Sequence, residues 1–539
     1  MGFWSFYFLA KLGLHLAGAI ELNWWLNLLF AVALLWSPPP RLRRLRQAVA
    51  VLIAIALLWH DSHWPSPWRV IEEWRALSAF SADYVAELIG RVVSWQVVGA
   101  LLLGAGLHAL LSRRLRLGAV AIAGLLAVPL LPLVPGLQPR APAEETAPME
   151  EVARRVMQPN DTEPATPAAS AAAPALDDKA LNQLLATFYQ KESEKGVGLP
   201  SSRDGTPGFD LVFLSVCSLA WDDLATAGIE GSSLLRRFDL VFRQFNSAAS
   251  YSGPAVLRLL HGSCGQGPQH ALYEASPQQC YLFRQLEQAG YDPALLLNHD
   301  GHFDHFSDQL RQQGGMGLKP MDNRGAPVAM HAFDGTPIFG DYDLLARWWN
   351  AGGPRKPGAS PRAVLYNTIS LHDGNRIVGY GSTSSTRTWK PRAEKLFADF
   401  ERFFALVEQS GRPTVVVLVP EHGAAIHGDA MQIPGLREYP TPRITHVPAG
   451  VALLGFGDRP AGRAPVVVDP VSSYTALVGV VAALLRNPGD PWNTLERVAR
   501  EIPPTQWVAE NDQTIVVREG GRLYLRGADG RWNRYAQER

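Results

Sequence analysis

A hydroxyl group lies where a helix is predicted to begin, in the stretch SYSGPAVLRLL at residues 250–260. Pro254 suits the first turn of a helix, and the mostly apolar run after it would face a core. Ser252 would then lie among free backbone N–H groups at the positive end of the helix dipole, where a phosphate-like anion can bind. Two interpretations stay open, because serine is both a favoured helix N-cap and a nucleophile.

Side chains that bind metal ions follow three apolar segments that we predict to be strands. Cys217 comes directly after the first, Glu421 and His422 come after the third, and His372 lies in the loop after the second. Active sites of parallel α/β folds gather at the carboxyl ends of the strands. The three segments are residues 210–216, 363–366 and 414–419.

Thiolate, carboxylate and imidazole are the groups that bind zinc. A Zn²⁺ ion between these residues and the Ser252 hydroxyl would lower the pKa of that hydroxyl and stabilise charge on a transferred phosphoryl group. Each residue alone has a simpler interpretation. Cys217 can be a small buried hydrophobe, Glu421-His422 a solvated loop, and His372 neither ligand nor base.

A second segment, HDGHFDH at residues 299–305, also has a composition typical of metal sites. A polar loop or a substrate-binding segment is the simpler interpretation, so we assign no metal to it.

The fold class follows from how apolar strands alternate with helical patterns after residue 179. Continuous apolar strands between helices predict an α/β domain, with a parallel sheet covered on both faces. A fourth strand is predicted at residues 451–455. Helices are predicted at residues 181–191, 232–245, 281–289, 344–350, 392–410 and 472–485.

The first 136 residues hold most of the long apolar runs, which predict about five transmembrane helices. A span needs about 20 apolar residues, so the shorter runs are weaker candidates, and buried helices of a soluble domain are the alternative. Residues 137–178, rich in Pro and Ala, are predicted to be a flexible linker to the domain at 179–539. The runs are residues 4–20, 22–36, 49–59, 92–111 and 117–134.

Basic residues between these runs predict the orientation. The positive-inside rule places the loops that hold Arg41–Arg46 and Arg113–Arg116 in the cytoplasm, and everything after residue 134 outside. Trp64, Trp68 and Trp74 would lie in an outward segment at the membrane interface. Lys plus Arg and Asp plus Glu both number 50, so nothing indicates a nucleic-acid partner.

The chain resembles the cellulose phosphoethanolamine transferase family, membrane-anchored enzymes that accompany bacterial cellulose synthesis. The resemblance covers the predicted soluble domain nearly end to end, and the membrane-plus-linker plan agrees with it. The motifs that carry it are VCSLAWDD (216–223), SYSGP (250–254), SCGQ (263–266), YNT (366–368), LHDGN (371–375) and VPEHG (419–423).

The resemblance implies an alkaline phosphatase-like fold and assigns roles to particular residues. Zinc would be held by Cys217, Glu421 and His422, next to the nucleophile Ser252, which would also contact the metal. His372, Tyr251 and Arg437 would line the substrate phosphate. A Cys264–Cys280 disulfide is implied as well, which an exported domain permits.

The implied reaction is ping-pong transfer from phosphatidylethanolamine. Ser252 would take the phosphoethanolamine group, and a glucosyl hydroxyl of nascent cellulose, most simply the primary one, would then receive it. His372 would act as general acid or base, or hold the phosphate. The resemblance implies a multi-pass protein of the bacterial inner membrane, with a periplasmic catalytic domain and the cellulose synthase subunits as partners.

Two alternative functions stay open at this point. One is an enzyme of the same fold with another acceptor or donor, such as lipid A modification or phosphoglycerol transfer. The lipid A enzymes typically have Thr as nucleophile, an acidic residue at the position of Cys217 and Asp-His in place of Glu421-His422, which argues against that branch. The other alternative is a non-catalytic membrane scaffold for the cellulose synthase complex.

Overall fold

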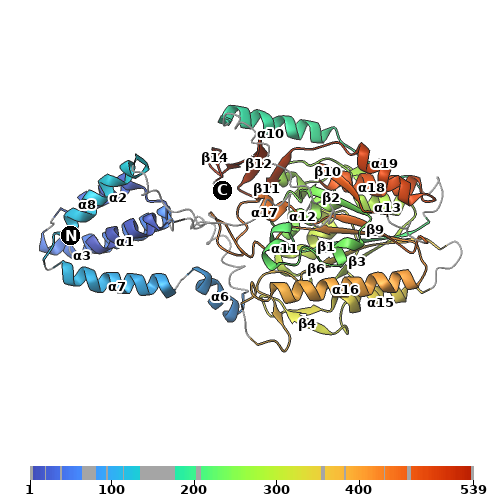
Figure 1. The fold of residues 1–539 in the computed structure, drawn as a ribbon, viewed down its shortest axis with the longest axis horizontal. Coiled ribbons are helices and arrows are strands. Elements are labelled where there is room, and N and C mark those ends of the chain that lie inside the picture. Colours follow the sequence, from blue (N-terminus) through green and yellow to red (C-terminus); the bar gives the residue numbers. More distant parts are fainter. Residues whose placement is uncertain are drawn as a thin grey trace.

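The computed structural model shows helices from the N-terminal part of the chain beside a larger α/β domain (Figure 1). The described residues are 4–17, 20–36, 39–62, 80–92, 95–112, 114–133, 176–201, 208–353, 359–381, 384–429, 431–457 and 463–535. Nearly all of the predicted linker at 137–178 therefore lies outside the described residues, as do Trp64, Trp68 and Trp74.

A seven-stranded sheet forms the centre of the larger domain, in the order β10-β2-β9-β8-β1-β6-β3. The pairs β10/β2, β8/β1, β1/β6 and β6/β3 are parallel, whereas β9 runs antiparallel to both β2 and β8. The sheet is thus mainly parallel, as predicted, with one reversed strand. Its strands are β1 (Asp210–Val216), β2 (Leu240–Phe245), β3 (Asp292–Leu297), β6 (Arg362–Thr368), β8 (Thr414–Pro420), β9 (Gly450–Leu454) and β10 (Val466–Ser472).

Both faces of this sheet are covered, which explains why β1 and β8 are buried at every position. Successive side chains of a strand point to opposite faces. Accordingly, Leu211 and Phe213 belong to one hydrophobic cluster, and Val212 and Leu214 belong to another. The prediction of a sheet between two helical layers is confirmed for this domain.

Different helices supply the two layers. The cluster that contains Phe213 includes residues of α12 (Ser252–Leu260), α13 (Leu282–Gln288), α14 (Phe306–Gln312), α18 (Tyr474–Arg486) and α19 (Pro491–Glu501). The cluster that contains Leu214 includes residues of α11 (Trp221–Ala227), α15 (Asp341–Ala351) and α16 (Trp389–Gln409).

One predicted helix, at residues 232–245, is wrong. A short 3-10 turn at Leu234–Arg237 is followed by strand β2. Asp239 explains the difference, because its N–H donates to Val451 O and its carbonyl accepts from Val466 N. These neighbours lie more than 200 residues away, so strand pairing overrides the local pattern. Strands β3 and β10 were not predicted, and residue 472 ends β10 instead of beginning a helix.

Two smaller sheets complete the domain. An antiparallel sheet of β11 (Trp507–Glu510), β12 (Ile515–Glu519), β13 (Arg522–Arg526) and β14 (Trp532–Arg534) packs on α10 (Asp178–Ser193). The other contains β5 (Pro337–Phe339), β4 (Val328–His331) and β7 (Arg376–Ile377).

Except for the helix at Ala82–Val92, the N-terminal helices overlap the apolar runs of the sequence. None of the helices in the described part of the chain is both long and apolar enough to cross a membrane, so the predicted count of five spans is not confirmed. The helices are α1 (Trp4–Leu16), α2 (Trp24–Ala33), α3 (Arg43–Asp61), α6 (Ala82–Val92), α7 (Trp95–Leu111) and α8 (Leu117–Ala127).

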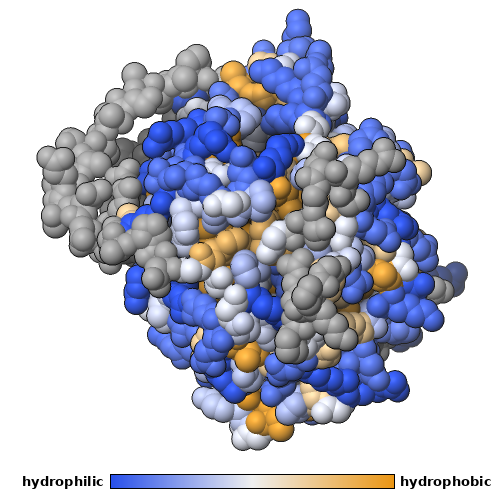
Figure 2. All heavy atoms as spheres, turned by 90° about the vertical axis from the view of Figure 1, so that its right-hand side faces the viewer, coloured by the Kyte–Doolittle hydropathy of each residue, from blue (hydrophilic) through white to orange (hydrophobic). Residues whose placement is uncertain are grey.

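Large apolar side chains are nevertheless exposed on these helices. Leu103 and Leu102 of α7 are 77% and 70% exposed, and Leu52 of α3 is 68% exposed. The end of the α/β domain farthest from these helices is instead mainly hydrophilic, with small apolar patches (Figure 2). The two parts of the chain therefore have surfaces of different character.

Candidate active site

The strands that precede the predicted metal ligands end at the same row of the sheet. Because β1 pairs in parallel with both β6 and β8, Val216 is in register with Thr368 and with Pro420. The residues that follow each strand therefore leave the sheet at one edge. Cys217 and Glu421 are the first of these residues on β1 and β8.

Ser252 reaches the same edge from α12. Tyr251 is the N-cap of this helix and Ser252 is its first residue, so the N-cap interpretation of Ser252 is wrong. The Ser252 Oγ instead lies 3.3 Å from Cys217 Sγ and 3.3 Å from His422 Nε2. The structure thus brings the helix N-terminus and the strand ends together.

Cys217, Glu421 and His422 form a compact buried cluster. Their ligand atoms all lie within 4.8 Å of one another, and Cys217 Sγ is 3.8 Å from His422 Nε2. Among the described residues this is the one group of three or more Cys, His, Asp or Glu side chains with such spacing. The HDGHFDH segment forms no such group among the described residues; His299 is buried, whereas His302 and His305 are exposed.

Hydrogen bonds outside the cluster fix the orientation of its members. The His422 Nδ1–H donates to Gly423 O at 2.8 Å, which leaves Nε2 for a ligand role. Glu421 Oε1 accepts from Ser215 Oγ at 2.9 Å and from Asn367 Nδ2. Its second oxygen, Oε2, is buried and has no hydrogen-bond partner, which is the condition expected of a carboxylate oxygen that binds a cation.

The electrostatics of the cluster also fit a cation. Burial raises the pKa of the Cys217 thiol to about 12 and that of the Glu421 carboxyl to about 7, and burial lowers the pKa of His422 well below its ordinary value. A bound cation favours the deprotonated forms of all three groups. A thiol, a carboxylate and an imidazole are a ligand set suited to Zn²⁺.

Arg437 lies beside Ser218 and Tyr251, which are the sequence neighbours of Cys217 and Ser252. Its Nη1 donates to Ser218 Oγ at 3.2 Å, and its Cζ lies 5.7 Å from the centroid of the Tyr251 ring. Ser218 adopts a positive φ of 65°, which turns the chain sharply after Cys217. A guanidinium at this position can bind an anionic group that reaches Ser252.

His372 is held through its own backbone and ring. Its Nδ1–H donates to Asp373 O at 2.7 Å, and Arg392 donates to His372 O at 2.8 Å. Burial, and secondarily the charge of Arg437, lowers the pKa of His372 to about 4, so the imidazole is neutral near pH 7. Within the described residues no hydrogen bond joins His372 to Ser252.

Sequence reasoning missed three residues that organise this site. Ser215 and Asn367 hold Glu421, as described above, and Asp223 connects the loops that carry the ligands. Asp223 Oδ2 accepts from Ala220 N at 3.0 Å and from Ala424 N at 2.7 Å. An acidic pair in the first turn of α11 was the available signal for Asp223.

The remaining cysteines, Cys264 and Cys280, are joined by a disulfide. It lies between the end of α12 and the start of α13 and leaves Cys217 as the free, buried thiol among the described residues.

Fold and site together define the class: an α/β protein with a hydroxyl beside a buried metal-type cluster, at the carboxyl edge of a mainly parallel sheet. Similar solved structures include a Vibrio parahaemolyticus protein in the alkaline phosphatase superfamily (16% identity, TM-score 0.48, 66% of this chain and 87% of that chain). Another is the integral membrane lipooligosaccharide phosphoethanolamine transferase A from Neisseria meningitidis (12% identity, TM-score 0.41, 89% of this chain and 95% of that chain).

The chain belongs to the BcsG family of cellulose biosynthesis proteins. The family model for the "Cellulose biosynthesis protein BcsG C-terminal domain" matches residues 165–532, and the model for the N-terminal domain matches residues 4–130. The cellulose biosynthesis protein BcsG of Escherichia coli K12 is 36% identical over 550 residues, which cover 99% of this chain and 96% of that protein.

Proposed function

We propose that this protein is a zinc-dependent phosphoethanolamine transferase. It takes the phosphoethanolamine group from phosphatidylethanolamine and transfers it to glucosyl hydroxyls of nascent cellulose. One observation carries the proposal: the Ser252 Oγ lies 3.3 Å from ligand atoms of both Cys217 and His422, at the N-terminus of α12. Membership of a family of cellulose biosynthesis proteins supports the acceptor.

Cys217, Glu421 and His422 would hold the zinc ion, with Ser252 as a further contact. When bound, zinc supplies a Lewis acid that favours the serine alkoxide and neutralises charge on the phosphoryl group. The free backbone N–H groups at the start of α12 favour the same negative charge.

In the first half-reaction the Ser252 hydroxyl loses its proton and its Oγ attacks phosphorus of the lipid. The bond from phosphorus to the diacylglycerol oxygen breaks, and the leaving oxygen takes up a proton. Arg437 and Tyr251 would hold the phosphate during this step, since Tyr251 directly precedes Ser252 and Arg437 Cζ lies 5.7 Å from the centroid of the Tyr251 ring. A phosphoethanolamine ester of Ser252 remains.

In the second half-reaction a glucosyl hydroxyl attacks that ester and loses its proton, and the Ser252 oxygen leaves and takes up a proton. His372 is neutral near pH 7, so its imidazole is able to accept that proton or to hold the phosphate by a hydrogen bond. The Ser252 oxygen is thus the attacking group in the first half-reaction and the leaving group in the second.

The location we propose is the bacterial inner membrane, with the catalytic domain (179–539) in the periplasm, the linker (137–178) before it and the N-terminal helices (1–136) as the anchor. The exposed leucines of α3 and α7 support contact with lipid. This location brings the enzyme to its lipid donor and to the emerging polymer, with the cellulose synthase subunits as neighbours.

The test uses the full chain in detergent, with a chromogenic phosphoethanolamine ester as donor. Zinc content, release of the leaving group and intact mass are recorded for the parent, for Ser252→Ala and for the surface control Ser233→Ala. We expect Ser252→Ala to retain zinc, to lose at least about 10³-fold in turnover and to form no phosphoethanolamine adduct. A zinc-loaded parent with neither turnover nor adduct contradicts the proposal and favours a scaffold role.

A further inference from the structure

Helix α6 belongs to the N-terminal part of the sequence but packs against the catalytic domain (Figure 1). The contact begins where Ser81 N–H donates to Phe333 O at 2.9 Å. At the other end, Arg91 binds the Asp373 carboxylate with both guanidinium nitrogens, Nη1 to Oδ2 at 2.6 Å and Nη2 to Oδ1 at 2.8 Å. Tyr84 Oη donates to the same carboxylate at 2.8 Å. Asp373 lies 282 residues after Arg91 and 289 residues after Tyr84 in the sequence.

The charges across this contact alternate and are largely buried. Glu87 accepts from Arg91 at 2.6 Å within α6 and from Arg376 across the contact. The side chains of Arg91 and Glu87 are each 10% exposed, and that of Asp373 is 9% exposed. Removal of one member of a buried charge network leaves its partner without compensation, so such a network specifies one docked position.

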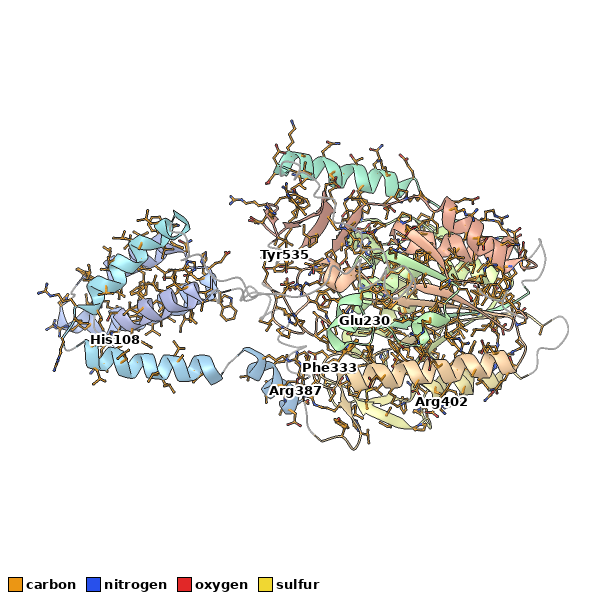
Figure 3. All side chains as sticks on the ribbon, in the orientation of Figure 1. His108, Glu230, Phe333, Arg387, Arg402 and Tyr535 are labelled. Carbon is orange, nitrogen blue, oxygen red and sulfur yellow. A yellow bond between two sulfur atoms is a disulfide. The ribbon has the colours of Figure 1, made fainter. Side chains whose placement is uncertain are left out.

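The network bears directly on the loop that carries His372. Asp373 is the next residue, and its carbonyl accepts the His372 Nδ1–H at 2.7 Å. The Phe333 ring lies 5.1 Å from the His372 ring, centroid to centroid, and the Tyr84 ring lies 6.1 Å from that of Phe333. Figure 3 shows Phe333 where α6 meets the catalytic domain.

The same guanidinium also reaches the loop that carries Arg437. Gly435 has a φ of +84°, and a Cβ built on it would lie 2.5 Å from Arg91 Nη1 and 3.1 Å from Asp373 Oδ2. Glycine is therefore needed at this position both for its backbone conformation and for the space that Arg91 occupies. Arg91 thus lies between the His372 loop and the Arg437 loop, and it contacts both.

We propose that α6 is a positioning element for the active site, in which Arg91, Tyr84 and Glu87 hold the His372 and Arg437 loops in their working arrangement. The proposal rests on the proposed transferase function for the reaction involved. None of the three residues is a metal ligand or touches Ser252 within the described structure, so they act through Asp373 and Gly435. Transfer is then efficient only while the N-terminal part is docked on the catalytic domain.

The experiment compares Arg91→Ala with the parent in the full chain, using the chromogenic phosphoethanolamine ester. We expect kcat to fall by roughly 10- to 100-fold, because misplacement of a catalytic group by about 1 Å can cost about 100-fold. Zinc content is expected to stay unchanged. Arg91→Lys should recover part of the loss, and ethylguanidinium added at millimolar concentration should raise kcat of Arg91→Ala but not of the parent.

Asp83→Ala serves as the matched control, since Asp83 is an exposed residue of the same helix. An active parent with an unchanged kcat in Arg91→Ala overturns the positioning proposal. A loss in Arg91→Ala that ethylguanidinium does not rescue, together with a lower unfolding temperature, also overturns it in favour of a purely structural contact. Failure of the transferase proposal is distinguished from both, because the parent itself would then be inactive.

Discussion

Asn367 connects the metal-type cluster to the interior of the sheet. Its Nδ2 donates to Glu421 Oε1 and, at 3.2 Å, to Ser215 Oγ. Its Oδ1 lies 3.0 Å from His299 Nε2, and that buried ring holds the amide in one orientation. The side chain is fully buried, so its hydrogen bonds with these partners are not replaced by water when one is removed.

We expect Asn367→Ala to lower zinc affinity by roughly 10- to 100-fold, the usual effect of losing a partner that orients a metal ligand. Glu421 would keep Ser215 but lose the amide that fixes its carboxylate. Competition with a chelating dye measures the affinity, with Asn493→Ala, an exposed position on α19, as the control. Equal affinities for parent and Asn367→Ala would show that Asn367 has no part in metal retention.

The members of the buried cluster were predictable from the sequence, whereas the residues that support them were not. Cys217, Glu421 and His422 follow apolar strands, and residues after parallel strands meet at one edge. Ser215 and Asn367 lie inside strands, and their meeting depends on the β1/β6 register, which pairs these two residues. No pattern within either strand encodes that register, so only the assembled sheet reveals their role.

At the level of elements, His446 joins the end of α17 (Pro442–Thr445) to β2. Its Nε2–H donates to Arg243 O at 2.8 Å, and its ring lies 5.6 Å from that of Trp507 and 6.4 Å from that of Trp221. Burial lowers the pKa of His446 to about 4. The folded protein therefore keeps this imidazole neutral over a range in which the unfolded chain binds a proton.

The lowered pKa of His446 makes the folded protein less stable as pH falls. Between the ordinary histidine pKa of about 6.5 and the folded value of about 4, the unfolded state binds more protons, so the free energy of unfolding falls as pH falls, by about 1.4 kcal/mol per pH unit for one such group. Unfolding of His446→Gln takes up one proton fewer in this pH range. We therefore expect its free energy of unfolding to fall less steeply than that of the parent as pH falls. Tryptophan fluorescence during urea unfolding at pH 7, 6 and 5 measures it.

His372 has a lowered pKa for the same reason and stays in both proteins, so the difference between parent and variant isolates His446. Identical slopes in the two proteins would show that His446 titrates normally in the folded state.

The bounds of a strand were predictable from the sequence where all its side chains are buried. They were not predictable where pairing with a distant strand determines the secondary structure. The first strand, residues 210–216, has the bounds of β1, since every side chain in it is buried. The segment 232–245 contains a strand instead of a helix, because Asp239 and β2 pair with β9 and β10, both of which come much later in the chain.

At the scale of the whole molecule, α7 presents an apolar surface that is unlike the surface of the catalytic domain. Leu103 and Leu110 are 77% and 68% exposed. We expect the double variant Leu103→Lys/Leu110→Lys to bind lipid vesicles less, since lysine at the centre of a lipid-facing helix costs about 3 kcal/mol. Turnover of the soluble chromogenic ester should be unchanged.

Vesicle flotation measures that binding, and the exposed charge variant Arg114→Ala is the control. Equal flotation of the parent and of the double variant would mean that this face of α7 does not contact lipid.

The reversed strand β9 has a consequence for how this protein family can diversify. Because β9 runs against β8, the chain between Glu421 and Ala449 leaves the catalytic edge and returns to the same edge, and it carries Arg437 on the way. A change in the length of this excursion leaves the register of both strands intact. The end of this excursion that carries Glu421 and His422 and the middle that carries Arg437 can therefore change independently of each other. The chain around Arg437 can thus vary in sequence and length while the Cys217, Glu421 and His422 cluster is kept.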